Sequence, residues 1–316
     1  RQVLTERPES ALMHFLWLIT AVGLVRAFSS TGVTQVAIVL GGGVSLGLQL
    51  LIGWWQLIQQ RSFAAYHWLG ETNLSNWFGI AKGEWFGREI TLPYGTTAHP
   101  NILANSLVIL WWFTWLGIKP YLYKPAKNPT EQVLIVAWLI SSLLSIGLII
   151  STQSSTGIVA GCLAIALAIV SSLKPTISRT TAHAVRWISV ILIVAAPLVM
   201  SFLQSSNIAI TQQLSWVRRT ELFDRSILIV KQQPIWGIGL AQSSIFLSGV
   251  GGTSEVVRFV QPVHNLFWLI LVETGLVGVF SALMILRRYL VQQPSFISIY
   301  SLAWILLVPA AALDHF

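Results

Sequence analysis

The chain has 316 residues, of which 54% are hydrophobic and only 9% are charged. A soluble domain of this length cannot cover its surface with so few charges, so the composition excludes a soluble globular protein and indicates a polytopic membrane protein. The net charge of +8 does not indicate a nucleic-acid partner, because short loops hold many of the lysines and arginines. The single cysteine, Cys162, lies in an apolar run, which excludes an internal disulfide.

Hydropathy predicts an all-α transmembrane helix bundle with about eight spans, each needing about 20 apolar residues. The chain begins at Arg1 without an initiator methionine and stops at Phe316 directly after an apolar run. We therefore interpret residues 1–316 as a single transmembrane domain, truncated at both ends. The predicted spans are 11–28, 33–58, 99–118, 132–152, 156–173, 185–204, 263–286 and 296–312.

Three short loops predict the orientation of the chain, because they carry cations and almost no acid. Their cations are Lys119, Lys124 and Lys127, then Lys174, Arg179 and Arg186, then Arg287 and Arg288. Loops of this kind face the cytoplasm. The long connections 60–98 and 205–262 are then outer loops, and the tryptophans and glycines of 60–98 predict short helices lying on the membrane surface. Within 205–262, the pattern of residues 216–230 predicts an amphipathic helix that is ended by Pro234.

The large outer loop carries the strongest candidates for binding an anion, namely its arginines. An arginine fork matches the geometry of phosphate, and it binds a diphosphate well near a low-dielectric boundary. Arg218 and Arg225 have a second interpretation as local ion pairs with Glu221, at helical spacings of three and four residues. Arg219 has no acid at those spacings after it, so it is the preferred functional arginine. Arg258 adds a further cation to the same loop.

His264 opens the predicted span 263–286 and follows Pro262. A neutral imidazole at the mouth of a water-accessible cavity could accept a proton from a sugar hydroxyl or orient that hydroxyl. The alternative is an interfacial histidine that caps the helix. Glu273 lies about 13 Å further along the helix and on its opposite face, so it is a poor direct partner for His264. It is either a functional acid or a member of a buried structural hydrogen bond.

A third candidate stretch precedes the predicted span 99–118. His99 and Asn101 flank Pro100, which favours a helix start. Asn101 could contact a ligand or fix the loop, and both side chains are interpreted first as loop anchors. The outer loops lack a paired-carboxylate cluster, a His/Cys metal spacing, a phosphate-binding glycine loop and a nucleophile motif. Chemistry without a metal or cofactor, in which arginines stabilise a leaving diphosphate, therefore remains open.

Several of these segments resemble the O-antigen ligase/polymerase superfamily of integral membrane glycosyltransferases. The segment YGTTAHPNILANSL resembles the family pattern G-T-x-x-H-P-N-x-L-A. The segment RTELFDRSILIVKQQPIWGIGL resembles R-x-E-x-W followed by P-x-x-G-x-G. The segment HNLFWLILVETGLVG resembles H-N-x-x-L-x-x-x-x-E-x-G-x-x-G, and the terminal Leu-Asp-His-Phe resembles D-H-Y/F. The order and spacing agree from about residue 60 to 316.

The resemblance implies a glycan donor on undecaprenyl diphosphate in the bacterial cytoplasmic (inner) membrane, surrounded by membrane lipids. The glycan would pass to a hydroxyl of a glycan or lipid-linked acceptor on the outer, periplasmic face, without metal or nucleotide. By motif, Arg219 would bind the diphosphate and His264 would activate or orient the acceptor hydroxyl. Arg218 and Arg225 are secondary candidates that match no fixed motif position.

The chain departs from the family at one place. Where the family often has an arginine that is a proposed second diphosphate ligand, this chain has Ser155. A neighbouring cation such as Arg218 or Arg258 then substitutes, phosphate binding is weaker, or the member is inactive. The rival functions are a lipid-linked-glycan flippase or transporter, which needs no acceptor-activating histidine, and a non-catalytic scaffold.

Overall fold

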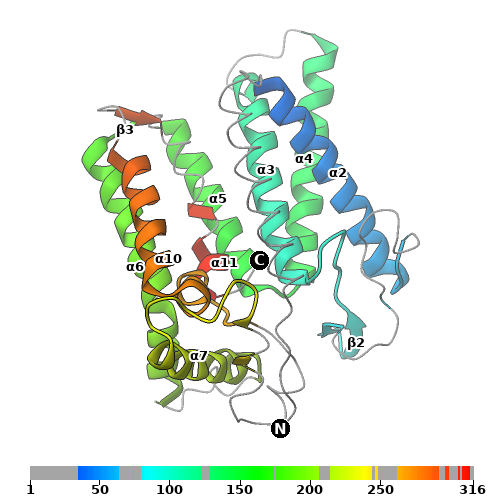
Figure 1. Cartoon of the computed structure of the whole chain (residues 1–316). Coiled ribbons are helices and arrows are strands. Elements are labelled where there is room, and N and C mark those ends of the chain that lie inside the picture. Colours follow the sequence, from blue (N-terminus) through cyan, green and yellow to red (C-terminus); the bar gives the residue numbers. More distant parts are fainter. Residues whose placement is uncertain are drawn as a thin grey trace. The chain divides into compact units, whose positions relative to one another are not determined.

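The computed structural model is mostly helical, as predicted, and it separates into two compact units (Figure 1). It describes residues 35–63, 74, 80–122, 128–173, 176–205, 214–243, 246–247, 262–291, 296–298, 305–306 and 308–313. The first unit comprises Arg1–Thr31, Thr176–Ser298 and Ala310–Phe316, and the second comprises Gly32–Pro175 and Ile299–Pro309. Each unit is described by itself.

The second unit is a helical bundle in which α3 packs against α2, α4 and α5. Its helices are α2 (Gln35–Gln59), α3 (Pro100–Leu122), α4 (Pro129–Ser151) and α5 (Ser155–Leu173). Small residues let α5 approach α3 closely, since a side chain on Gly157 would collide with Ala104. The buried Ala160, Ala164 and Ala168 continue this row at helical spacing.

A short β-hairpin lies between α2 and α3, where short surface helices were predicted. Strand β1 (Lys82–Trp85) pairs antiparallel with β2 (Arg88–Thr91). The loop residues Phe86 and Gly87 both have positive φ, of 49° and 74°. Two-residue hairpin turns favour this backbone, and glycine adopts it without strain. The helix prediction for this described part of 60–98 is therefore wrong.

The first unit contains the helices α6 (Arg179–Ser205), α7 (Leu214–Gln232) and α10 (Leu266–Val291). Helix α7 packs against both α6 and α10, and Figure 1 shows it running across them. Strands β3 (Thr176–Ser178) and β4 (Phe296–Ser298) pair antiparallel in the same unit. The short helix α11 (Val308–Leu313) contributes its last residues to this unit.

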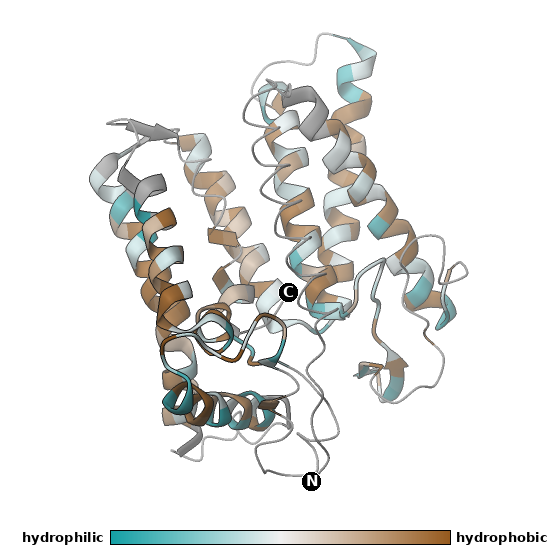
Figure 2. Ribbon diagram, in the orientation of Figure 1, coloured by the Kyte–Doolittle hydropathy of each residue, from teal (hydrophilic) through white to brown (hydrophobic). Residues whose placement is uncertain are grey.

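Among the described residues, five helical stretches are long and apolar enough to cross a membrane. They are Pro100–Leu122, Pro129–Ser151, Ser155–Leu173, His183–Leu203 and Leu266–Ile285. Figure 2 shows the hydrophobic colour along α4, α5, α6 and α10, whereas α7 mixes both colours. The prediction of about eight spans is not confirmed.

The remaining predicted spans have different outcomes. The span 11–28 lies outside the described residues, and 33–58 coincides with α2, which is not among the five stretches. The span 296–312 is wrong as a continuous helix, because its described residues 296–298 form the strand β4 and its described end lies in the six-residue α11. Pro309, in the first turn of α11, begins a helix more readily than it continues one.

Candidate functional site

Helix α7 carries the candidate arginines on two different faces. Residues three, four and seven apart share a face of a helix. Arg218, Glu221 and Arg225 therefore form one row, whereas Arg219 shares a row with Phe223, whose side chain is buried. The prediction of an amphipathic helix over 216–230 is confirmed by α7, which extends two residues further at each end.

Arg225 is buried, and each of its two terminal nitrogens donates a hydrogen bond. Nη2 donates to Glu221 Oε1 at 2.9 Å, and Nη1 donates to the backbone oxygen of Leu247 at 2.6 Å. The i,i+4 pairing with Glu221 that the sequence suggested is therefore present. A buried charge needs such partners, because its desolvation is otherwise very costly. Arg225 thus ties Leu247 to α7.

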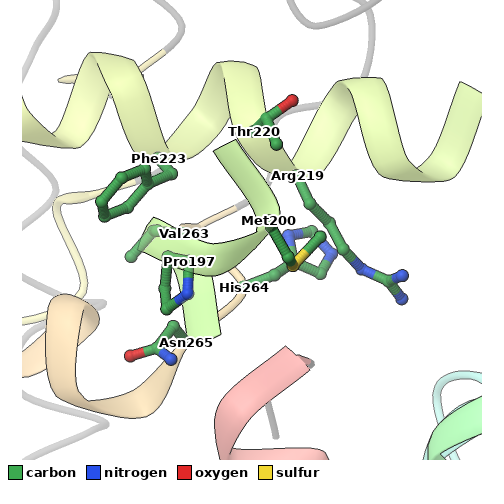
Figure 3. A pocket seen from close by; sticks show the side chains of 8 residues that line it. All are labelled: Pro197, Met200, Arg219, Thr220, Phe223, Val263, His264 and Asn265. Atoms are coloured by element: carbon green, nitrogen blue, oxygen red, sulfur yellow. The ribbon is translucent and has the colours of Figure 1, made fainter. Parts of the chain in front are cut away.

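Arg219 and His264 line the same small pocket (Figure 3). Its cavity volume is about 10 Å³, close to the space that one water molecule needs. The lining residues are Pro197 and Met200 of α6, Arg219, Thr220 and Phe223 of α7, and Val263, His264 and Asn265 before α10. A cation and an imidazole thus share a pocket whose other walls are largely apolar.

The orientation of the two polar side chains follows from their elements. Because Phe223 and Leu222 anchor α7 in the core of the unit, Arg219 is held on the same side of the helix at its N-terminal end. Figure 3 shows its guanidinium pointing away from Phe223 and Asn265. The ring of Phe223 packs edge-on against Trp268 of α10, with ring centroids 4.9 Å apart. This contact connects the arginine helix to the helix that follows His264.

Pro197 and Asn265 together explain how His264 is positioned. Proline has no backbone N–H, so Pro197 leaves the carbonyl of Ile193, four residues earlier in α6, without its helical donor. The Asn265 side chain supplies one, since Nδ2 donates to Ile193 O at 2.7 Å and to Ala312 O of α11 at 2.9 Å. Its Oδ1 accepts from the backbone N of Trp268 at 3.1 Å, which caps α10. Asn265 therefore caps α10.

Asn265 and Pro197 are the positioning residues that the sequence interpretation did not single out. Asn265 is only 1% exposed and its side chain joins α6, α10 and α11. A proline in the middle of an apolar span was the available signal, because it predicts a carbonyl that needs a donor from elsewhere. The sequence could not show that this donor lies beside His264.

Glu273 takes part in a structural contact away from His264. Its Oε1 accepts a hydrogen bond from Ser243 Oγ at 2.7 Å. Of the two alternatives for this carboxylate, the observed contact corresponds to the structural hydrogen bond. This hydrogen bond lies next to the segment of α10 that bonds the backbone of residues 234–239.

His99 and Asn101 belong to the second unit, at the start of α3. The backbone N of Asn101 donates to His99 Nδ1 at 3.1 Å, so the imidazole holds the first turn of the helix. The preceding loop is fixed by Gln56 of α2, whose Oε1 accepts from the amides of Tyr94 and Gly95 at 2.8 and 2.7 Å. These contacts match the loop-anchor interpretation. Contact of His99 or Asn101 with substrate stays a prediction.

The remaining predicted positions are Ser155, Arg258 and the terminal motif. Ser155 is the exposed first residue of α5, and the preceding Ser154 caps that helix through the amide of Gly157 at 3.1 Å. Arg258 and Asp314-His315-Phe316 lie outside the described residues. In the part of the chain that the structure describes, no cluster of three His, Cys, Asp or Glu side chains could hold a metal ion. Metal-free chemistry stays a prediction.

One comparison with known proteins gives a match. A family model described as O-antigen ligase matches residues 140–283, a range that contains both Arg219 and His264. The comparisons with curated proteins and with solved structures give no match.

Proposed function

We propose that the chain transfers a glycan from undecaprenyl diphosphate to an acceptor hydroxyl. The premise is the match of residues 140–283 to the O-antigen ligase family model. The family match and the apolar helices support a multi-pass membrane protein of the glycosyltransferase type. The donor, the acceptor sugar or lipid, and the bacterial inner membrane as the site of action belong to the proposal.

The observation that carries the proposal is the shared pocket of Arg219 and His264. The two residues come from separate elements: Arg219 lies on α7, whose Leu222 and Phe223 are packed in the core, and His264 precedes Asn265, which bonds α6. Glycosyl transfer from a diphosphate needs a fixed positive charge for the leaving group and a polar group for the incoming hydroxyl. The pocket supplies one of each.

In the proposed reaction, the acceptor oxygen forms a bond with the anomeric carbon of the donor sugar. The bond from that carbon to the diphosphate oxygen breaks, and its electron pair leaves with the diphosphate. Arg219 stabilises the charge that develops on the leaving group, and the largely apolar walls strengthen this interaction by excluding water. His264 accepts the proton of the acceptor hydroxyl or orients that hydroxyl.

The other arginines of α7 have supporting roles in this proposal. Arg218 lies on the row of Glu221 and Arg225, and it would contribute positive potential for the donor near the helix rather than at the reacting atoms. Arg225 is held by Glu221 and Leu247, so it would hold Leu247 against α7 and act structurally. The active site would face the outside, because the short cationic loops favour the cytoplasm.

Transfer by purified protein in lipid nanodiscs tests the proposal. The donor is an undecaprenyl-diphosphate oligosaccharide, the acceptor is the lipid or glycan fraction of the host envelope, and the readout is released undecaprenyl diphosphate. Arg219→Ala and His264→Ala are expected to lower the rate at least about 100-fold, the scale of losing an electrostatic or acid–base group. Arg219→Lys should recover only part of it, because a lysine cannot bind phosphate through two parallel bonds.

Lys231→Ala is the matched control, because Lys231 is an exposed cation on the same helix. This variant should transfer glycan at the wild-type rate. Full activity in both Arg219→Ala and His264→Ala would refute the assigned roles. Movement of the lipid-linked glycan across the membrane without release of undecaprenyl diphosphate would instead establish a transporter.

A further inference from the structure

Helix α10 is interrupted at Gly275, and a turn that follows α7 fills the interruption. Gly275 has φ 63° and ψ −162°, so two helical segments meet there. In a continuous helix the amides of Leu276 and Val277 would donate to the carbonyls of Val272 and Glu273. Here both the amides and the carbonyls bond residues of the 234–239 turn instead. The bonds are Leu276 N to Pro234 O (2.9 Å), Val277 N to Ile235 O (3.2 Å), Ile238 N to Val272 O (3.0 Å) and Gly239 N to Glu273 O (2.9 Å).

This turn and the interruption fit one another closely. A side chain on Gly237 would place its Cβ 2.5 Å from the carbonyl carbon of Glu273, and one on Gly275 would collide with the backbone of Ile235. Gly237 and Gly275 both have positive φ, which glycine adopts readily. The backbone of the turn therefore replaces part of the helix ladder of α10.

The length of α10 places the interruption inside the membrane. Arg287 is the first charged residue after Leu276 and is exposed. The distance between them along the helix is about 16 Å, about half of the 30 Å hydrocarbon core. The long side chain of Arg287 can reach the headgroups while its backbone lies deeper in the membrane. The interruption is then further from that surface, but it still lies within the hydrocarbon core.

Contacts with α6 place the beginning of α10 in the apolar layer as well. Asn265 and Trp268, at the beginning of α10, bond the carbonyls of Ile193 and Val194. Ile193 lies in the middle of the apolar span His183–Leu203, about 15 Å from each end. The segment of α10 before Gly275 therefore contacts α6 within the apolar layer. Because lipid offers no hydrogen bonds, an interrupted helix at this depth requires partners such as those of the 234–239 turn.

The turn exposes large apolar side chains on the surface that α10 presents to lipid. Trp236 is 72% exposed and Ile235 is 54% exposed. The bond from Val277 to Ile235 places them beside the exposed Leu276 and Val277, and Phe280 continues this surface along α10. An apolar surface that is continuous with a membrane-spanning helix has acyl chains as its natural occupant.

We infer that residues 234–239 form a re-entrant turn that inserts into the bilayer, where Ile235 and Trp236 contact lipid acyl chains. The turn anchors the C-terminal end of α7, and so the helix that carries Arg219, to the membrane. This contact is independent of the chemistry proposed for Arg219 and His264, since it needs no substrate and no reaction.

Spin labels at single cysteines in nanodiscs test the insertion. In a Cys162→Ser background, which removes the exposed cysteine, Trp236→Cys is labelled and its accessibility to oxygen and to a water-soluble nickel chelate is measured. Phe280→Cys, on the exposed apolar face of α10, is the lipid control, and Asp224→Cys, on the exposed side of α7, is the water control. Far-UV circular dichroism confirms that each labelled protein keeps its helices.

The label at residue 236 is expected to match that at residue 280, with high oxygen and low nickel accessibility. A nickel accessibility equal to that at residue 224 would place the turn in water and overturn the inference. Low accessibility to both reagents would mean that a protein surface covers Trp236, and it would overturn the inference as well.

Discussion

The contacts of Asn265 give a prediction that needs no substrate. Replacement of Asn265 by alanine removes one helix cap and two hydrogen bonds to buried carbonyls. A cap contributes about 1 kcal/mol, and each internal hydrogen bond contributes about 1 kcal/mol. The free energy of unfolding should therefore fall by about 3 kcal/mol. Exposed Gln232→Ala on α7 is the control and should change it by less than about 0.5 kcal/mol.

The role of Pro197 makes this prediction specific. In a Pro197→Ala background, residue 197 has an N–H that can donate to Ile193 O, so one of the bonds from Asn265 is no longer needed. Asn265→Ala should then cost about 1 kcal/mol less than in the wild-type background. Equal costs in the two backgrounds would refute the explanation that the proline-freed carbonyl selects asparagine at residue 265.

Aspartate at position 265 provides a second discriminating variant. It keeps the oxygen that caps α10, but it replaces a donor with a carboxylate facing the carbonyls of Ile193 and Ala312. Asn265→Asp is therefore expected to be less stable than Asn265→Ala at neutral pH. Equilibrium unfolding by sodium dodecyl sulfate in mixed micelles, followed by far-UV circular dichroism, measures all of these variants. A carboxylate that left the protein more stable than alanine would show that the cap alone matters.

Three further predictions concern α7 and its turn, and the same unfolding assay measures them. Gly237→Ala should lower the free energy of unfolding by at least about 1 kcal/mol, because residue 237 has a positive φ and the new Cβ would collide with the backbone of Glu273. Gly47→Ala is the control and should not lower it, because a Cβ at this position on α2 meets open space. Glu221→Gln should cost about 3 kcal/mol by leaving the buried Arg225 without its acid, and adding Arg225→Met should recover part of this loss. Partial burial, with Glu221 as a second cause, raises the pKa of Asp224 above its ordinary 3.8. The folded protein then binds this proton more tightly than the unfolded protein does, so the free energy of unfolding falls as the pH rises above that value. Asp224→Asn should therefore stabilise the protein at pH 7 but not at pH 3.

Local signals were sufficient to predict α7 and its two rows of side chains. The amphipathic pattern from Trp216 and the stop at Pro234 are properties of a few neighbouring residues, and the helix Leu214–Gln232 follows them. The pairing of Glu221 with Arg225 is equally local, since both lie on one helical row. Long apolar runs likewise predicted α3, α4, α5, α6 and α10.

Contacts between distant segments could not be predicted in the same way. Asn265 bonds residues far away in the chain, in α6 and α11, and no periodicity of the sequence indicates such partners. The β-hairpin was missed because its tryptophans suggested membrane-surface helices. The two-residue loop Phe86-Gly87, between short segments that pair in register, was the stronger signal.

The segments P-x-x-G-x-G and E-x-G are separate patterns in the sequence, but their backbones pack against each other in the structure. Gly237 and Gly275 occur where each backbone must approach the other, and the carbonyl of Glu273 accepts from Gly239. Their conformations are thus explained by the fold alone, without reference to a reaction. Arg219 and His264 differ, because their side chains line a pocket. For this reason the proposed chemistry rests on these two residues, and the glycines are assigned to the structure that positions them.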